Sequence, residues 1–181
     1  VTKNKLRLIV EENLGDKDVA IYGSFLVKLV SMGKNAGIGC LIHDTPDAWM
    51  HLVDHHDMEL DHDEAKMERA IDLASKVLQA NNEEYAGLID FDDLLYFAVK
   101  NGISLPKFDW VLVDELQDTN AIQRAIIRKI MKDTSRFMGV GDDAQAIYGF
   151  RGADSDSMDL VAKEFNCKTL PLTVTYRCPV S

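Results

Sequence analysis

Cysteine is scarce in this chain, and its placement excludes a disulfide framework. The three cysteines are Cys40, Cys167 and Cys178. Because their number is odd, pairing cannot use all of them, and no C-x-x-C spacing suggests a zinc site. Free thiols in a reducing compartment explain this usage best, so we expect a cytoplasmic protein.

The sequence also lacks a long apolar run and an excess of positive charge. No stretch approaches the ~20 apolar residues that span a bilayer, and the opening VTKN shows no signal-peptide pattern, so we expect no membrane partner. The formal net charge of −10 argues against non-specific nucleic-acid binding by the surface as a whole. Five cations could still form a local basic surface, or a solvated helix face: Arg124, Arg128, Lys129, Lys132 and Arg136.

The composition is that of a folded domain, and its first half is predicted to be helical. Of the 181 residues, 46% are hydrophobic and 28% are charged, which is enough for one domain with or without an insertion. Apolar residues at helical spacing predict helices at 3–12, about 18–33 and 63–78. Thr45 followed by Pro46 predicts the start of another helix. We expect residues 1–87 to form a helical subdomain without strands.

Near residue 88 the pattern changes to strands that alternate with helices. Trp110 to Val113 is a short apolar run, typical of a strand that is buried on both faces. The predicted elements are a helix at 91–100 after Asp90, a strand at 110–113, a helix at 121–131, and strands at 137–140 and 169–176. This alternation predicts a parallel α/β sheet in residues 88–181.

Polar segments follow the first two predicted strands. Asp114 and Glu115 come directly after the apolar run, at the sheet edge where parallel α/β proteins bind ligands. Asp114 could hold Mg²⁺, and Glu115 could act on a water that attacks a phosphate. The alternative is a solvated strand end followed by a helix cap at Asp118 or Thr119. Gln145, after the second strand, could bond a phosphate oxygen or the attacking water.

Two further segments carry groups suited to nucleic acid and phosphate. Tyr148, Phe150 and Arg151 fall within four residues and have Gly149 and Gly152 beside them, a pattern that could stack unpaired bases. These rings could equally fill a core. Arg177 follows the third predicted strand, from where a guanidinium can reach a phosphate.

Taken together, these segments resemble one family, the UvrD/Rep-type superfamily 1 DNA helicases. VDELQDTN (113–120) is similar to the family's motif II, GDDAQAIYGFRGA (141–153) to motif III, and LTVTYRCP (172–179) to motif IV. IDFDDLL (89–95) resembles the start of the helix that precedes motif II. The resemblance covers residues 88–181 and implies a partial RecA-like P-loop NTPase sheet with an N-terminal helical insertion.

The resemblance implies ATP and Mg²⁺ as cofactors. Asp114 would hold the Mg²⁺ ion, Glu115 would position or deprotonate the hydrolytic water, and Gln145 would sense the γ-phosphate. Tyr176 would pack on the adenine, and Arg177 would contact the γ-phosphate.

The resemblance also implies partners: single-stranded DNA and the rest of a helicase polypeptide. Tyr148 and Phe150 would stack on DNA bases, and Arg151 would tie their loop to the nucleotide site. The predicted function is therefore an ATP-dependent helicase or translocase that moves along single-stranded DNA. The alternative is a non-catalytic relic of the fold that binds DNA or protein.

A P-loop, however, is missing from the sequence. The motif needs G-x-x-x-x-G-K followed by Ser or Thr, and the only Gly-Lys pair, Gly33-Lys34, precedes Asn35 at the end of a helical stretch. We interpret this pair as a helix C-terminus. The chain is thus expected to be an internal fragment of the first motor domain, inactive as an ATPase alone. Without the P-loop strand the sheet has a bare edge, through which a dimer could form.

One more segment, His51 to Glu64, is rich in metal-ligand side chains. His51 and His55 have the i, i+4 spacing that could bind Zn²⁺ or Ni²⁺. The segment is acidic throughout and lacks an H-E-x-x-H order, so a solvated helix or loop is the competing interpretation.

Overall fold

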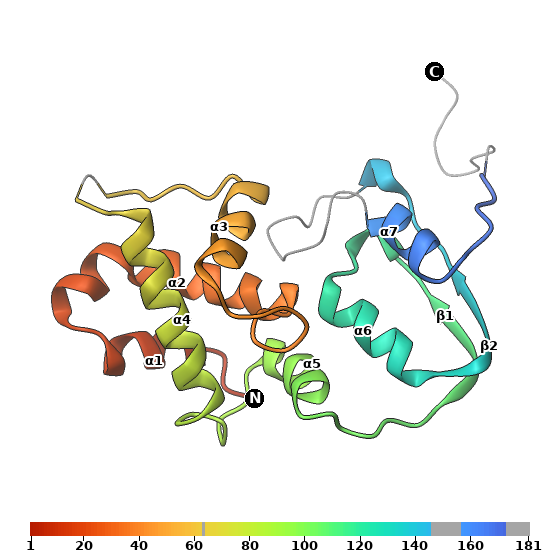
Figure 1. Cartoon of the computed structure of the whole chain (residues 1–181), viewed down its shortest axis with the longest axis horizontal. Helices are drawn as coiled ribbons and strands as arrows, with labels where there is room; N and C mark the ends of the chain where they lie inside the picture. Colours follow the sequence, from red (N-terminus) through yellow and green to blue (C-terminus); the bar gives the residue numbers. More distant parts are fainter. Residues whose placement is uncertain (63, 146–156, 173–181) are drawn as a thin grey trace.

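The computed structural model describes residues 1–62, 64–145 and 157–172, which form a helical lobe and a smaller α/β lobe (Figure 1). The helical lobe holds α1 (Lys5–Asn13), α2 (Asp16–Ala36), α3 (Pro46–His55), α4 (Met67–Asn82) and α5 (Phe91–Lys100). The α/β lobe holds β1 (Phe108–Val113), the 3₁₀ turn η1 (Leu116–Asp118), α6 (Ala121–Ile130), β2 (Met131–Gly139), the 3₁₀ turn η2 (Asp143–Gln145) and α7 (Ser157–Glu164). This mixed order of helices and strands confirms the predicted α/β class in its coarse form.

Helix ends lie where capping chemistry predicts them. The Thr45 side chain accepts a hydrogen bond from the Ala48 amide, with Pro46 in the first turn of α3. Asp90 and Asp93 form a reciprocal capping box at the start of α5. Gly37 ends α2 with a φ of 84°, a conformation that glycine adopts without strain. The fourth helix starts at Met67, later than the predicted start at 63, and ends at Asn82.

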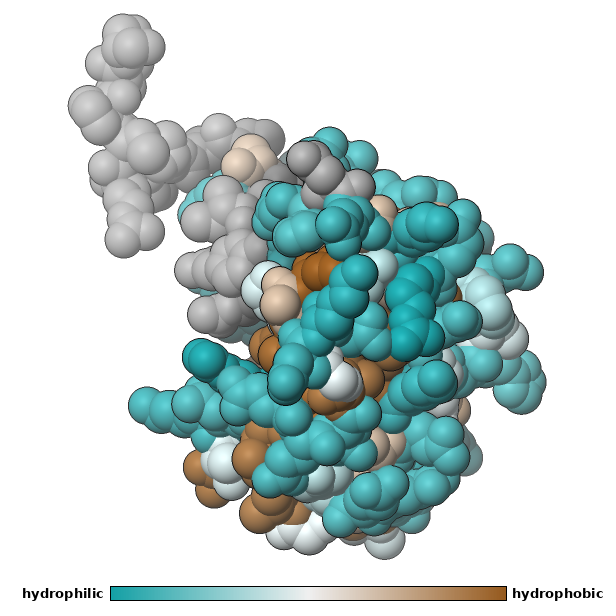
Figure 2. All heavy atoms as spheres, turned by 90° about the vertical axis from the view of Figure 1, so that its left-hand side faces the viewer, coloured by the Kyte–Doolittle hydropathy of each residue, from teal (hydrophilic) through white to brown (hydrophobic). Residues whose placement is uncertain are grey.

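The core of the helical lobe lies between α1, α2, α3, α4 and α5. Trp49, Leu26, Leu29 and Tyr96 are fully buried in it. Figure 2 shows hydrophilic side chains over much of the outer face of this lobe, with apolar side chains visible between them. Among the described residues up to 87, the only β-type pairing is an isolated bridge between Ile38 and Ile42.

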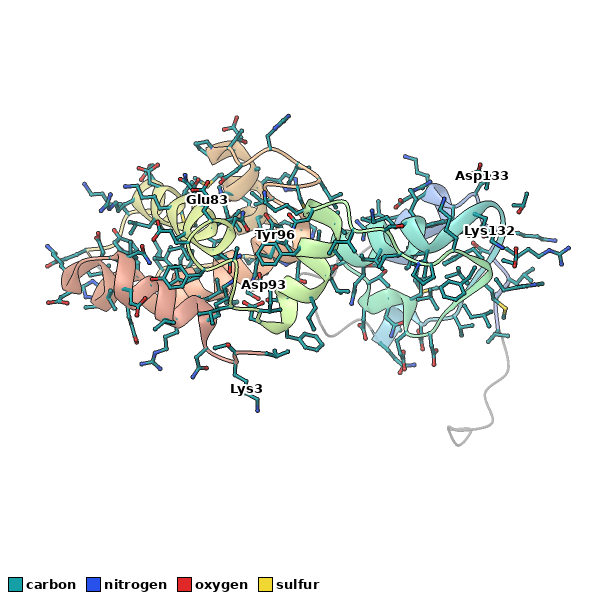
Figure 3. The ribbon with its side chains drawn as sticks, turned by 90° about the horizontal axis from the view of Figure 1, so that it is seen from below. Lys3, Glu83, Asp93, Tyr96, Lys132 and Asp133 are labelled. Carbon is teal, nitrogen blue, oxygen red and sulfur yellow. The ribbon has the colours of Figure 1, made fainter. Side chains whose placement is uncertain are left out.

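A buried ionic cluster joins α1, α2 and α5. Lys5 Nζ lies 2.8 Å from Asp93 Oδ2, and Lys34 Nζ lies 3.0 Å from Asp93 Oδ1 and 2.5 Å from Asp90 Oδ2. Both ammonium groups are fully buried. Figure 3 shows Asp93 and Tyr96 on α5 pointing into the helical lobe. Gly33-Lys34 therefore belongs to the last turns of α2, and its interpretation as a helix C-terminus is confirmed.

The sheet of the α/β lobe is parallel, as predicted, with α6 as the crossover between β1 and β2. Val111 pairs with Phe137, and Leu112 pairs with Met138. Helix α6 and the following α7 lie on one side of the strands (Figure 1), where Val111 is buried and Phe137 stacks on Phe165 at 4.8 Å.

The opposite face of the sheet is exposed, so the prediction of a strand buried on both faces is wrong for β1. Trp110, Leu112 and Met138 are 57%, 69% and 54% exposed. These side chains alternate with the covered ones along the strands, and the described chain places no layer over them. In the third predicted strand, residues 169–172 do not form a strand, and residues 173–176 lie outside the described residues.

Candidate functional site

The carboxyl ends of β1 and β2 meet at one edge of the sheet. Val113 pairs with Gly139, the Val140 amide donates to the Val113 carbonyl at 2.9 Å, and the Leu116 amide donates to the Val140 carbonyl at 2.9 Å. The segments that begin at Asp114 and Gly141 consequently leave the sheet side by side. This is the convergence that the sequence predicted for the two polar segments.

Asp114 and Glu115 present their carboxylates at this edge, and both residues are exposed. The Glu115 amide donates to Asp114 Oδ1 at 3.0 Å. Glu115 has a φ of 51°, a left-handed conformation that is unusual for a residue with a side chain and that occurs often at functional sites. This conformation turns the chain sharply from β1 into η1.

Gln117 lies beneath these carboxylates and connects the two strand ends. Its side chain is buried, accepts a hydrogen bond from the Asp142 amide at 3.0 Å and donates one to Glu115 Oε2 at 2.8 Å. Sequence reasoning assigned no role to Gln117. The only available signal was a neutral polar side chain two residues after Glu115 and directly before Asp118, which does not reveal burial.

Gln145 lies in η2, just after the end of β2, with an exposed side chain. Its Nε2 donates to Asp142 Oδ2 at 2.6 Å, while Asp142 Oδ1 accepts from the Ala144 amide at 3.0 Å. The structure therefore brings Asp114, Glu115 and Gln145 to the same edge of the sheet. An edge with two carboxylates and a primary amide can hold a hard cation and orient a water molecule.

Comparison with known proteins identifies the family of the chain. The model of the UvrD/REP helicase N-terminal domain matches residues 41–166. The chain belongs to this family. The predicted resemblance is thereby confirmed, and the match includes both strand ends and helix α6 between the strands.

Relatives of this UvrD/REP-family chain are DNA helicases. DNA helicase II of Escherichia coli strain K12 is 42% identical over 113 residues, which is 56% of this chain and 16% of the relative. The ATP-dependent DNA helicase Rep of Buchnera aphidicola from Acyrthosiphon pisum is 37% identical over 123 residues, covering 62% of this chain and 19% of the relative. The chain thus spans less than a fifth of the length of these relatives.

The remaining predicted site residues of this helicase-family chain lie outside the described residues. They are Tyr148, Phe150, Arg151, Tyr176 and Arg177. Their contacts with DNA bases, adenine or phosphate stay predictions, which rest on the resemblance alone.

The predicted basic surface is largely ion-paired. Arg128 contacts Glu164 at 3.1 Å, Lys132 contacts Asp109 at 2.6 Å, and the Arg136 guanidinium lies 5.0 Å from the Trp110 ring centroid. Lys132 lies at the far end of the α/β lobe from the helical lobe (Figure 3). Arg128 lies on α6, but Lys132 and Arg136 lie on β2, so the five cations do not share one helix face. The carboxylate partners of Arg128 and Lys132 weigh against a free basic groove.

Of the His51–Glu64 segment, residues 51–55 form the end of α3, and the described residues 56–62 and Glu64 follow that helix. The rings of His51 and His55 stack at 6.1 Å. Within the described part of the chain, which omits residue 63, no group of three or more histidine, cysteine, aspartate or glutamate side chains could hold a metal ion. In the same part, no helix is long and apolar enough to cross a membrane.

Proposed function

We propose that this chain is part of the first motor domain of an ATP-dependent DNA helicase, and that the edge at residues 114 and 141 is part of its MgATP site. One observation carries the proposal: parallel strands bring Asp114, Glu115 and Gln145 to one sheet edge in a chain of the UvrD/REP family. That edge is where open α/β sheets bind ligands. The names of the relatives, DNA helicase II and Rep, support ATP and DNA as ligands.

The donor set at this edge fits a hydrated divalent cation. Asp114 is exposed at the strand tip and uses Oδ1 for its neighbour's amide, so its carboxylate can still accept a metal-bound water. Bound MgATP would supply an electrophilic phosphorus for attack by water. Glu115 would orient that water and accept its proton, and Gln145 would donate to a γ-phosphate oxygen.

The same proposal covers the domain arrangement. Residues 1–87 would be the helical subdomain and residues 88–181 part of a RecA-like motor domain, with α5 contacting both α2 and α6. One β-α-β unit is present in β1, α6 and β2, and the exposed face with Trp110 and Leu112 would be covered by other parts of the motor. Single-stranded DNA would be bound with the help of Tyr148, Phe150 and Arg151.

The test uses two proteins, because the P-loop needed for phosphate binding is not in this sequence. The chain alone is expected to show no ATP turnover. In a chimera, residues 41–166 replace the matching segment of E. coli DNA helicase II, and DNA-stimulated ATP hydrolysis is measured. We expect the chimera to hydrolyse ATP, and Glu115→Gln to lower kcat by about 10²- to 10⁴-fold.

Asp109→Asn is the matched control, since Asp109 is exposed on β1 and pairs with Lys132 away from the edge. It should leave kcat unchanged. A chimera that melts cooperatively but does not hydrolyse ATP would overturn the motor proposal and favour a non-catalytic binding module. Full activity of the Glu115→Gln chimera would remove Glu115 from the mechanism.

A further inference from the structure

A series of hydrogen bonds connects Glu115 and Gln145, two of the predicted catalytic side chains. Gln145 Nε2 donates to Asp142 Oδ2 at 2.6 Å, and the Asp142 amide donates to Gln117 Oε1 at 3.0 Å. Gln117 Nε2 then donates to Glu115 Oε2 at 2.8 Å. The central link is Gln117, whose side chain is only 3% exposed.

Close packing shapes the space for this central link. A Cβ atom added to Gly141 would lie 2.6 Å from Gln117 Oε1 and 3.1 Å from the Leu116 amide nitrogen. A side chain at 141 would therefore displace the Gln117 amide from between the two strand ends. The Leu116 amide also donates a hydrogen bond to the Val140 carbonyl, so the backbone beside Gln117 has little freedom to adjust.

A hydrogen bond from a buried amide restricts the rotamers of an exposed carboxylate more than hydrogen bonds from mobile water do. Glu115 is exposed and, without a partner, would sample several rotamers. The bond from Gln117 fixes one of its oxygens, while the other oxygen can still face a water molecule. Because the amide is neutral, it orients the carboxylate without adding a charge at the site.

We propose that Gln117 is a positioning residue that holds the Glu115 carboxylate and couples it to the segment after β2, which carries Gln145. The proposal rests on the function proposed above. Movement of the 142–145 segment would change the Asp142–Gln117 bond and, through it, the orientation of Glu115. Contact of Gln145 with a γ-phosphate would in this way be transmitted to the group that handles the attacking water.

Two substitutions separate the two bonds of Gln117. Gln117→Met keeps the length of the side chain and removes both bonds. Gln117→Glu keeps an acceptor for the Asp142 amide but, when ionised, cannot donate to Glu115. In the 181-residue chain, hydrogen exchange of the Asp142 amide, followed by NMR, should be about 10-fold faster in Gln117→Met, and near the parent rate in Gln117→Glu, which retains the acceptor.

The ATPase kinetics of the chimera separate a positioning role from a purely structural one. A positioning role predicts a lower kcat with an unchanged KM for ATP. Both Gln117 variants should lower kcat by about 10-fold, the range found for groups that orient a reacting residue, with KM for ATP unchanged. Gln79→Met is the control, because Gln79 is an exposed glutamine on α4 that contacts only a neighbouring glutamate in its described bonds.

The outcomes distinguish this inference from the proposed function. A folded parent chimera without ATPase activity would overturn both. An active parent with unchanged kcat in Gln117→Met would overturn only the positioning role. A loss of kcat that is matched by an equal loss of thermal stability and a changed KM would also overturn it, because it would mark Gln117 as structural.

Discussion

Single side chains in the helical lobe show what sequence patterns did not predict. Lys5 and Lys34 were not expected in the core, because lysine is almost never fully buried unless it is paired. Their partner Asp93 is 88 residues from Lys5 and 59 from Lys34 in the sequence. Sequence reasoning placed a helix directly after Asp90, but only the fold brings the two lysines to the start of that helix.

Substituting Asp93 tests how much this cluster contributes. Asp93 accepts hydrogen bonds from Lys5, Lys34 and Asn81, as well as from the Asp90 amide. Asp93→Asn leaves two buried ammonium groups with one carboxylate, so we expect it to lower the free energy of unfolding by about 3–5 kcal/mol. Arg7→Met on α1 removes an exposed pair with Glu11 and should leave the urea midpoint almost unchanged. Equal midpoints for the two variants would contradict this.

The pH dependence of the same comparison has a definite sign. Burial opposes ionisation of Asp93, but the hydrogen bond from Lys5 and the charge of Lys34 outweigh it and hold its pKa below the ordinary value of 3.8. Its contribution is therefore fully present above the unfolded pKa and is lost as the pH falls through 3.8 towards the folded value. The stability difference between the parent and Asp93→Asn should shrink as the pH falls below about 5. Urea unfolding at a series of pH values measures this, and a difference that grows on acidification would contradict it.

Among the helices and strands, local sequence signals predicted where helices end, whereas the burial of the strands depends on tertiary contacts. The caps at Thr45 and Asp90 involve residues within three positions of each other, so the sequence carries them. The helix expected from 63 begins only at Met67, because an apolar stripe indicates a face and not a starting residue. Burial of β1 could not be predicted from its apolar run, since it depends on which layers are present on each face.

Alanine substitutions at two glycines of α2 should change the stability of the fold in opposite directions. A Cβ atom on Gly33 would lie 2.4 Å from the Trp49 ring, which is fully buried and held by a bond from Nε1 to Asp44. A Cβ atom on Gly23 would make ordinary contacts of 3.6 Å or more. We expect Gly33→Ala to destabilise the fold by about 1–3 kcal/mol through overpacking.

Gly23→Ala, in contrast, should stabilise the fold by about 0.5–1 kcal/mol, because alanine costs less backbone entropy than glycine in a helix. Thermal unfolding of the two variants beside the parent measures both effects. A gain in stability for both alanine variants would show that α3 can shift away from α2 without cost.

For the molecule as a whole, the sequence predicted the position of the candidate site but not its internal connections. Asp114, Glu115 and Gln145 reach one edge because parallel strands end on the same side, a rule that needs only the strand order. The two hydrogen bonds of Gln117 depend on the close approach of Gly141, which no pattern in the sequence predicts. The five predicted residues beyond position 145 lie outside the described residues, so the site is defined structurally at its two strand tips.

The exposed sheet face makes a final prediction about how the chain behaves alone and within a longer polypeptide. Leu112 and Met138 are paired neighbours on this face, beside Trp110, and all three are more than half exposed. We expect the isolated chain to self-associate through this face and edge. Replacing Leu112 and Met138 by threonine, a residue with high strand propensity, should shift the sedimentation velocity profile towards the monomer. Leu172 is 90% exposed and lies outside the sheet, so Leu172→Thr is the control and should leave the profile unchanged.

In the helicase II chimera the same pair of substitutions should act differently. If other parts of the motor domain cover this face, the two apolar side chains become buried, and threonine then costs stability by leaving hydroxyl groups in an apolar layer. The double variant should therefore be as stable as the parent in the isolated chain and should melt at a lower temperature than the parent in the chimera. Equal melting temperatures in the chimera would mean that the face stays open in the longer polypeptide, and that β1 and β2 do not form the centre of a covered RecA-like sheet.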